Sequence, residues 1–125
     1  MSTIDELIAA SPYYRYLGLR AGPSGTLVLP ADARNIGDYT RAVLHGGVLA
    51  AFLETAALLH LRASGADNAT TIECAIDFLR AAPVVDTTAV VTEVRRGRRV
   101  AHLRIDAHQG DAARPVAVSH GSWLV

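Results

Sequence analysis

The stretch from His45 to Leu61 reads HGGVLAAFLETAALLHL, and it decides the fold that the sequence predicts. Apolar residues fill nearly every position, so the segment lacks the broad polar face of a surface helix. The pattern predicts a helix that begins at Gly46 or Gly47, runs to about Ala63 and is capped by Gly65. Because such a helix is apolar all round, the rest of the protein must cover most of its sides.

After this helix the apolar period changes from 3.6 residues to 2. Ile72, Cys74, Ile76 and Phe78 alternate with other residues, which predicts a half-buried strand over 71–79 with Cys74 in the core. Further strands are expected at 26–30, 87–94, 100–107 and 116–125. In the strand at 100–107, the apolar Leu103, Ile105 and Ala107 alternate with polar residues, which predicts the face that packs on the core. A short helix over 4–17, broken at Ser11-Pro12, and a loop over 31–44 complete the chain.

The order of these elements predicts the fold class. The strands after the helix are joined by hairpin-length turns, which favours an antiparallel sheet. We therefore expect an α+β fold, a single domain over residues 1–125, with about five antiparallel strands wrapped around one long central helix. Trp123 in the last strand is expected to pack into the core.

The composition excludes several classes of protein. The 125 residues are 50% hydrophobic and 19% charged, unlike a disordered chain. Twelve basic residues balance twelve acidic residues, which argues against a nucleic-acid partner. Cys74 is the only cysteine, so no internal disulfide can form.

The N-terminus carries acidic residues and no apolar core of a secretory signal, so a cytoplasmic protein is the simplest expectation. The apolar stretch from Ala42 to Leu61 contains Glu54 near its centre. A charge at that depth of a bilayer costs several kcal/mol. We therefore interpret the stretch as a helix buried in protein, with no membrane partner.

Glu54 is the most informative residue of the helix. Its neighbours one turn away on either side are Ala50, Ala51, Ala57 and Leu58, none of which can pair with a carboxylate. A buried, unpaired carboxylate is costly, so a partner from outside the helix or a chemical role must justify it. A structural hydrogen bond and a catalytic role are the two interpretations.

His45-Gly46-Gly47 opens the helix. The first backbone N–H groups of a helix have no partner within it and carry the positive end of the dipole. Glycine lets another molecule approach that backbone closely, so these groups could form an oxyanion hole for an acyl carbonyl. The alternative is that the glycines only permit close packing and that His45 only caps the helix.

HGGVLAAFLETAA, followed by TIECAIDFLRAA, resembles the hotdog-fold thioesterases of the phenylacetate-pathway and 4-hydroxybenzoyl-CoA types. Those families carry His-Gly-Gly at the start of the central helix and an Asp or Glu nine positions after the His, as His45 and Glu54 are here. Their later strand ends in a turn similar to Phe78–Ala82. The resemblance extends from about Ser11 to Val125.

The resemblance implies a thioester hydrolase that acts on an acyl-CoA or acyl-carrier substrate without a cofactor or metal. It implies that the Gly46 N–H polarises the thioester carbonyl and that Glu54 acts as general base or as nucleophile. Thr71 would help to hold the water, and His45 would position the loop. Two subunits would build the site together, as a homodimer or homotetramer, with Gly46 of one chain facing Glu54 of the other.

Three positions depart from the family pattern. Tyr39 stands six residues before the His, where the family has Asn or Gln, and Asn35 is a nearby substitute. Leu58 replaces a Thr of the glutamate-type enzymes, and Ala42 replaces a Gly. We expect Asn35, Tyr39 and Leu58 to border the substrate, together with Gly47.

Arginines are candidates for binding the coenzyme A phosphates. Arg80 follows the strand at 71–79, and Arg98 lies in a turn with Arg95, Arg96 and Arg99. A solvated turn is the alternative. His102, Asp106 and His108 share one face of a strand, but their spacing is too wide for a metal site within that strand.

Two other functions stay open on sequence alone. A hotdog dehydratase or hydratase also pairs a His with an acidic residue, but the spacing and the Gly-Gly pair favour the thioesterase. A non-catalytic acyl-binding module is the third possibility, and Tyr39 and Leu58 are the residues that support it.

Overall fold

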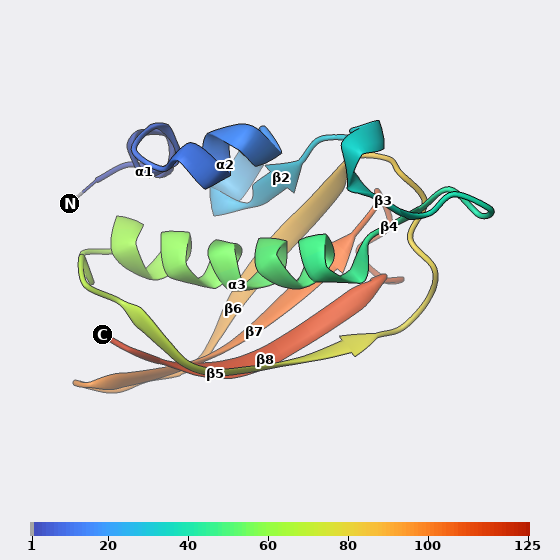
Figure 1. Ribbon diagram of the computed structural model, residues 1–125. Coiled ribbons are helices and arrows are strands. Elements are labelled where there is room, and N and C mark those ends of the chain that lie inside the picture. The colour runs from blue at the N-terminus through green and yellow to red at the C-terminus, as the bar shows by residue number, and fades with distance from the viewer. Residues whose placement is uncertain (1) are drawn as a thin grey trace.

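A computed structural model describes residues 2–125. Its main feature is a curved sheet that packs around one long helix (Figure 1). The helices are α1 (Ile4–Ala9), α2 (Pro12–Leu17) and α3 (Gly46–Ala63). The strands are β1 (Arg20–Ala21), β2 (Leu27–Leu29), β3 (Ile36–Asp38), β4 (Val43–Leu44), β5 (Thr70–Phe78), β6 (Thr87–Arg96), β7 (Val100–His108) and β8 (Ala117–Leu124). The predicted α+β arrangement is confirmed.

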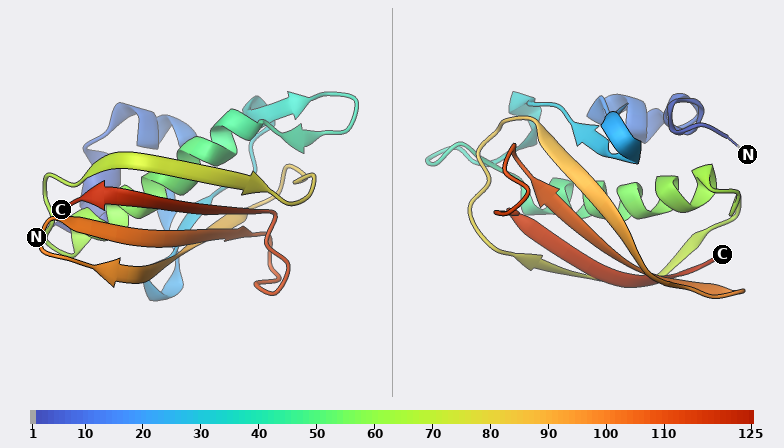
Figure 2. Two further views of the ribbon diagram at one scale, coloured as in Figure 1. Left: turned by 90° about the horizontal axis from the view of Figure 1, so that it is seen from below. Right: turned by 180° about the vertical axis from the view of Figure 1, so that it is seen from behind.

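The main sheet is antiparallel and has six strands in the order β1-β2-β6-β7-β8-β5 (Figure 2). We expected about five strands, and the additional one is the two-residue strand β1. The long strands of the sheet curl along one side of α3, while β2, α1 and α2 lie across the helix from them (Figure 1). Strand β5 comes directly after the helix and forms one edge of the sheet.

The long helix has the predicted ends. At its start, the Nδ1 atom of His45 accepts a hydrogen bond of 2.9 Å from the Gly47 N–H. At its end, the Gly65 and Ala66 N–H groups donate to the carbonyls of Arg62 and Leu61, and Gly65 has a φ of 108°. This left-handed turn closes the helix in the way that glycine favours.

The helix supplies much of the core. Eight of its residues are buried: Leu49, Phe52, Leu53, Thr55, Ala56, Ala57, Leu59 and Leu61. The helix is long and apolar enough to cross a membrane by length and composition, but here it is the central helix of the fold. In β7, Leu103, Ile105 and Ala107 point into the core as predicted, and Trp123 is fully buried.

Two expectations from the pattern were wrong. Residues 31–44 do not form a simple loop, because β3 and β4 pair as a small hairpin in which Ile36 lies opposite Leu44. In β5, Ile72 does not point into the core and is 53% exposed. A bulge between Thr71 and Glu73 breaks the alternation that the sequence pattern assumes.

Candidate functional site

Glu54 lies half-buried in the middle of α3, and its partner comes from the neighbouring edge strand. The Thr71 hydroxyl donates a hydrogen bond of 2.9 Å to the Oε2 atom of Glu54. Within residues 2–125 no Arg or His side chain forms an ion pair with Glu54. The carboxylate is therefore held by one neutral hydroxyl, and its second oxygen is left for another partner.

The bulge in β5 explains why Thr71 reaches Glu54. Strict alternation would place Thr71 and Cys74 on opposite faces of the strand. One extra residue between Thr71 and Glu73 brings both side chains to the face that packs on α3. The family resemblance assigned Thr71 to the site, whereas strict alternation with Cys74 would turn Thr71 away from the helix. The bulge explains how both side chains face α3.

Cys74 packs beside this pair. Its Sγ atom lies 2.9 Å from the Ser119 hydroxyl, and the residue is half-buried against the core. Burial raises the pKa of the Cys74 thiol, the Ser119 hydrogen bond lowers it, and the nearby charge of Glu54 raises it again. The thiol is therefore kept in its protonated form, as suits a packing residue rather than a nucleophile.

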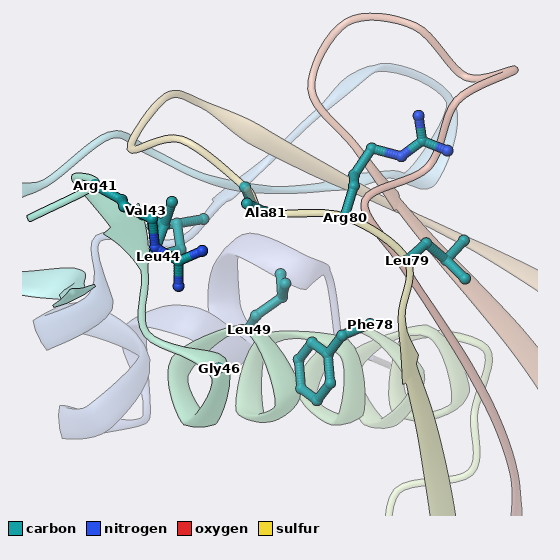
Figure 3. Close-up of a pocket in the computed structure, with 10 residues that line it drawn as sticks. Arg41, Val43, Leu44, Gly46, Leu49, Phe78, Leu79, Arg80 and Ala81 are labelled. Carbon is teal, nitrogen blue, oxygen red and sulfur yellow. The ribbon is translucent and has the colours of Figure 1, made fainter.

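Gly46 is the first residue of α3 and lines a cavity of about 370 Å³ (Figure 3). The ring of Phe78 lies beside it, 3.6 Å from the position that a Cβ on Gly46 would occupy. The cavity is lined by Arg41, Val43, Leu44, Gly46, Leu49, Phe78, Leu79, Arg80, Ala81 and Ala82. Gly46, the residue at this helix start, thus borders a space that a ligand can enter, and its N–H has no acceptor within the helix.

Gly47 has a different task from Gly46. Its N–H is already bonded to His45, and a Cβ on Gly47 would lie 2.9 Å from the His45 ring. Gly47 is therefore the residue that makes room for the cap. His45 caps the helix, and its own N–H donates a hydrogen bond of 2.7 Å to the Asn35 carbonyl.

The candidate residues of α3 do not meet within one chain. Gly46 and Glu54 are eight residues apart on the helix, which corresponds to about 12 Å. A carbonyl bound at Gly46 is thus out of reach of Glu54 on the same chain. The structure brings together Glu54 and Thr71 as one group, and Gly46, His45 and Asn35 as another.

The β3–β4 hairpin explains why Asn35 lies beside the helix start, although the family pattern has its Asn or Gln at the position of Tyr39, six residues before the His. The hairpin spans the residues between Asn35 and His45, so Asn35 lies directly beside the helix start and is only 5% exposed. Tyr39 is 84% exposed at the tip of the hairpin, apart from these residues. Leu58 lies half-buried one turn after Glu54 on the same side of the helix.

The two arginine candidates lie at opposite ends of the sheet. Arg80 follows the end of β5 and lines the cavity at Gly46. Arg98 lies in the turn between β6 and β7, near the level at which β5 begins. The length of β5 separates Arg80 from Arg98 by roughly 30 Å. A molecule bound in the cavity beside Arg80 therefore does not reach Arg98 of the same chain.

Sequence reasoning missed Arg41 as a residue that lines the cavity. It comes from the hairpin, whose two short strands lack the periodicity that would distinguish them from a loop. The residues described by the structure contain no group of three His, Cys, Asp or Glu side chains that could hold a metal ion. His102, which shares a strand face with Asp106 and His108, instead lies 3.0 Å from the Ser122 hydroxyl.

Solved structures share this fold. A conserved protein from Pseudomonas aeruginosa is 26% identical with a TM-score of 0.80, and the match covers 94% of this chain and 96% of that one. A mutant of the phenylacetic acid degradation protein PaaI from Thermus thermophilus is 25% identical, with a TM-score of 0.76 and coverage of 91% and 98%. A thioesterase from Haemophilus influenzae, at 22% identity, a TM-score of 0.85 and coverage of 99% and 90%, is alike in fold.

No curated protein matches the sequence as a relative. The family model of the acyl-CoA thioesterase N-terminal domain matches residues 36–124, which is more than two thirds of the chain. This match covers the hairpin, the central helix and the four long strands. The resemblance to hotdog thioesterases is confirmed, and the chain belongs to the acyl-CoA thioesterase N-terminal domain family, a family of thioester hydrolases.

Proposed function

We propose that the protein hydrolyses an acyl-CoA thioester at a site built by two copies of the chain. The observation that carries the proposal is the half-buried Glu54, which the Thr71 hydroxyl holds and no cation neutralises within residues 2–125. A carboxylate kept in this way is available to accept a proton. The family match supports a coenzyme A thioester as the substrate.

In the proposed reaction the thioester carbonyl of the substrate accepts a hydrogen bond from the Gly46 N–H. Glu54 of the second copy removes a proton from a water molecule, and the water oxygen bonds to the carbonyl carbon. The carbon–sulfur bond then breaks, the coenzyme A thiolate takes up the proton that Glu54 removed, and the free acid leaves. Thr71 occupies one oxygen of Glu54, so the other is directed at the water.

Direct attack by Glu54 on the carbonyl is the second candidate for this step. It would form an anhydride between Glu54 and the acyl group as the carbon–sulfur bond breaks and the coenzyme A thiolate leaves, and water would then hydrolyse the anhydride. A single turnover in ¹⁸O-labelled water distinguishes the two routes. Label in the Glu54 side chain requires the anhydride, hydrolysed at the Glu54 carbon. Label in the released acid alone, with no acyl-enzyme detected by rapid-quench mass spectrometry, supports the general base.

The proposal of a shared site rests on distance and on exposed surface. Gly46 and Glu54 are about 12 Å apart on one helix, so a second copy must supply one of them. The helix leaves Ala50, Ala51, Glu54 and Leu58 only half-buried. The adjacent strand β5 is an edge, with unpaired backbone groups that another copy can bond.

Mixing two inactive variants tests the shared site. Gly46→Pro removes the backbone N–H, and proline is well tolerated at the first position of a helix. His45 has φ −62° and ψ 127°, a conformation that suits the residue before proline. Glu54→Ala removes the carboxylate. After unfolding and refolding the two variants together, we expect about a quarter of wild-type activity, because mixed dimers keep one complete site.

Gly46→Ala is the matched control, since it adds a methyl group but keeps the N–H. The methyl group would touch only the Phe78 ring at ordinary contact distance. This variant is expected to keep more activity than Gly46→Pro, because it retains the N–H. No recovery of activity in the mixture, with each variant folded, would overturn the shared site.

A homodimer or homotetramer, a cytoplasmic location and the lack of membrane and nucleic-acid partners stay predictions.

A further inference from the structure

The β3–β4 hairpin is the part of the chain that the proposed reaction does not use. It continues past the N-terminal end of α3, beyond the main sheet (Figures 1 and 2). Its tip carries Tyr39, which at 84% is the most exposed large hydrophobic side chain of residues 2–125. Tyrosine is enriched at protein interfaces, so this tip is a candidate for contact with another chain.

The hairpin tip is a fixed turn. The Asp38 carboxylate accepts hydrogen bonds from the Thr40 N–H at 2.9 Å and from the Arg41 Nε at 2.8 Å. Ala42 then returns the chain toward the helix with a φ of 50°, a left-handed conformation that alanine rarely adopts. Such strain persists only where the surrounding structure imposes it. The tip thus has one shape before any partner binds, which lowers the entropic cost of a contact.

A partly exposed stripe follows one face of α3. Its members are spaced four residues apart, and they are Ala50, Glu54, Leu58 and Arg62. The stripe borders the edge strand β5, because Glu54 accepts the hydrogen bond from Thr71. The Nη2 atom of Arg62 donates a hydrogen bond of 3.0 Å to the Ala69 carbonyl, which holds the guanidinium in place. A held guanidinium next to a leucine suits the face of an aromatic ring.

The proposed shared site determines how two copies face each other. When Gly46 of each copy meets Glu54 of the other, the two α3 helices run antiparallel about a twofold axis. Leu58 lies one turn, about 6 Å, beyond Glu54. It is therefore level with a point about 6 Å before Gly46 of the second copy. Arg62 is level with a point about 12 Å before it.

The hairpin of the second copy reaches these two levels. The chain from Gly46 back to Val43 spans about 10 Å when extended. Val43 pairs with Asp38, and Tyr39 lies just beyond this pair at the tip. The hairpin continues past the start of the helix in both views, so its length is directed along the neighbouring stripe (Figures 1 and 2).

We infer that the β3–β4 hairpin clasps a second copy of the chain, with Tyr39 of one copy packed between Leu58 and Arg62 of the other. The inference rests on the proposed function, because the shared site sets the register of the two helices. It goes further, since Tyr39 then forms a wall of the partner's site, one turn beyond the reacting carboxylate of Glu54. Tyr39 and Leu58 are apart within one chain, and the dimer brings them together.

Cross-linking between single cysteines tests the contact. Cys74→Ala first removes the native cysteine, and Tyr39→Cys and Leu58→Cys are then made in separate chains that are refolded together. A short bismaleimide should join the two chains in the mixture. Leu58→Cys alone should not cross-link, because Ala50 lies at the twofold axis and the two copies of Leu58 are about 24 Å apart. Tyr39→Cys alone should not cross-link either, since the tips lie farther still from the axis.

Tyr13→Cys is the matched control, because Tyr13 is another exposed tyrosine and lies on α2. Mixed with Leu58→Cys, it should give no covalent dimer. Equal cross-linking by Tyr13→Cys and Tyr39→Cys would overturn the inference. A dimeric mixture of Tyr39→Cys and Leu58→Cys that does not cross-link would also overturn it.

Sedimentation measures the strength of the contact. Tyr39→Ala should raise the Kd of the dimer about a hundredfold, because the dimer loses two rings and each buried interface tyrosine contributes about tenfold. Tyr39→Phe keeps the ring and should stay within about threefold of the wild type. Tyr13→Ala should leave the Kd unchanged. An unchanged Kd in Tyr39→Ala would overturn the inference.

These measurements use no substrate, so they separate the inference from the proposed hydrolysis. A cross-linked dimer of a protein that hydrolyses no acyl-CoA would contradict the hydrolysis and still support the hairpin contact. Activity recovered in the mixture of Gly46→Pro and Glu54→Ala, without a link between residues 39 and 58, would support the shared site and overturn the hairpin contact. A wild type that sediments as a monomer at every concentration would overturn both.

Discussion

Two carboxylates join α3 to the sheet, and they have opposite surroundings. Glu54 projects from the helix and meets only the Thr71 hydroxyl of β5. Glu93 projects from β6 and meets His60 of the helix at 2.9 Å and Arg96 at 2.8 Å. The same kind of group therefore has one hydroxyl partner near the middle of the helix, and a histidine and an arginine as partners near its C-terminal end.

The difference separates a group poised for chemistry from a group that stabilises the fold. The His60 hydrogen bond is the main cause that lowers the pKa of Glu93, and the Arg96 contacts add to it. The charge of Glu93 is thus satisfied inside the protein. Since no cation satisfies Glu54 in the part of the chain that the structure describes, its charge is available to a ligand.

The largest expected effect tests this contrast directly. Glu54→Gln should lower kcat by about a thousandfold, because an amide cannot act as a base. Its melting temperature should stay at or above that of the wild type, since a half-buried carboxylate is removed. Glu93→Gln is the control and should keep kcat within about twofold. A comparable loss of kcat in both variants would break the contrast.

Thr71 provides the next test. Thr71→Val keeps the shape of the side chain but removes the hydroxyl that bonds Glu54. We expect kcat to fall about tenfold with a smaller change in KM, because the carboxylate loses its orientation. Thr71→Ser should restore most of the rate. If valine and serine behave alike in a steady-state assay, the hydroxyl does not position Glu54.

The structural role of Glu93 predicts a pH dependence of stability. Folding lowers the pKa of Glu93 from 4.5, so its contribution is complete above that value and is lost as the pH falls through the folded pKa. With its side chain 36% exposed, the pair is worth about 0.5 kcal/mol after screening. Urea unfolding should show Glu93→Gln less stable than the wild type at pH 7 and equal to it in acid. A difference that persists in acid would contradict this origin.

The smallest effect concerns the strained residue before the helix. Ala42→Gly relieves the left-handed backbone, but glycine also gains freedom in the unfolded chain. These terms oppose each other, and we expect a gain of about 0.5 kcal/mol in the free energy of unfolding. Destabilisation by a full kcal/mol in urea unfolding would show that the turn is not strained at this position.

Local patterns determined much of the fold. The run of apolar residues and its flanking glycines predicted α3 and its ends, because helix periodicity and capping depend on neighbours in sequence. The alternation in Leu103, Ile105 and Ala107 predicted the face of β7 for the same reason. Glu54 was identifiable because no residue within one turn could pair with it.

The tertiary structure decided what local patterns cannot express. The bulge that turns Thr71 toward Glu54 arises from the pairing of β5 with β8, far along the chain. The hairpin that places Asn35 beside His45 depends on the contact of two short strands with little periodicity of their own. Which residues share a wall of the cavity, Arg41 among them, likewise follows from packing across long sequence distances rather than from sequence spacing.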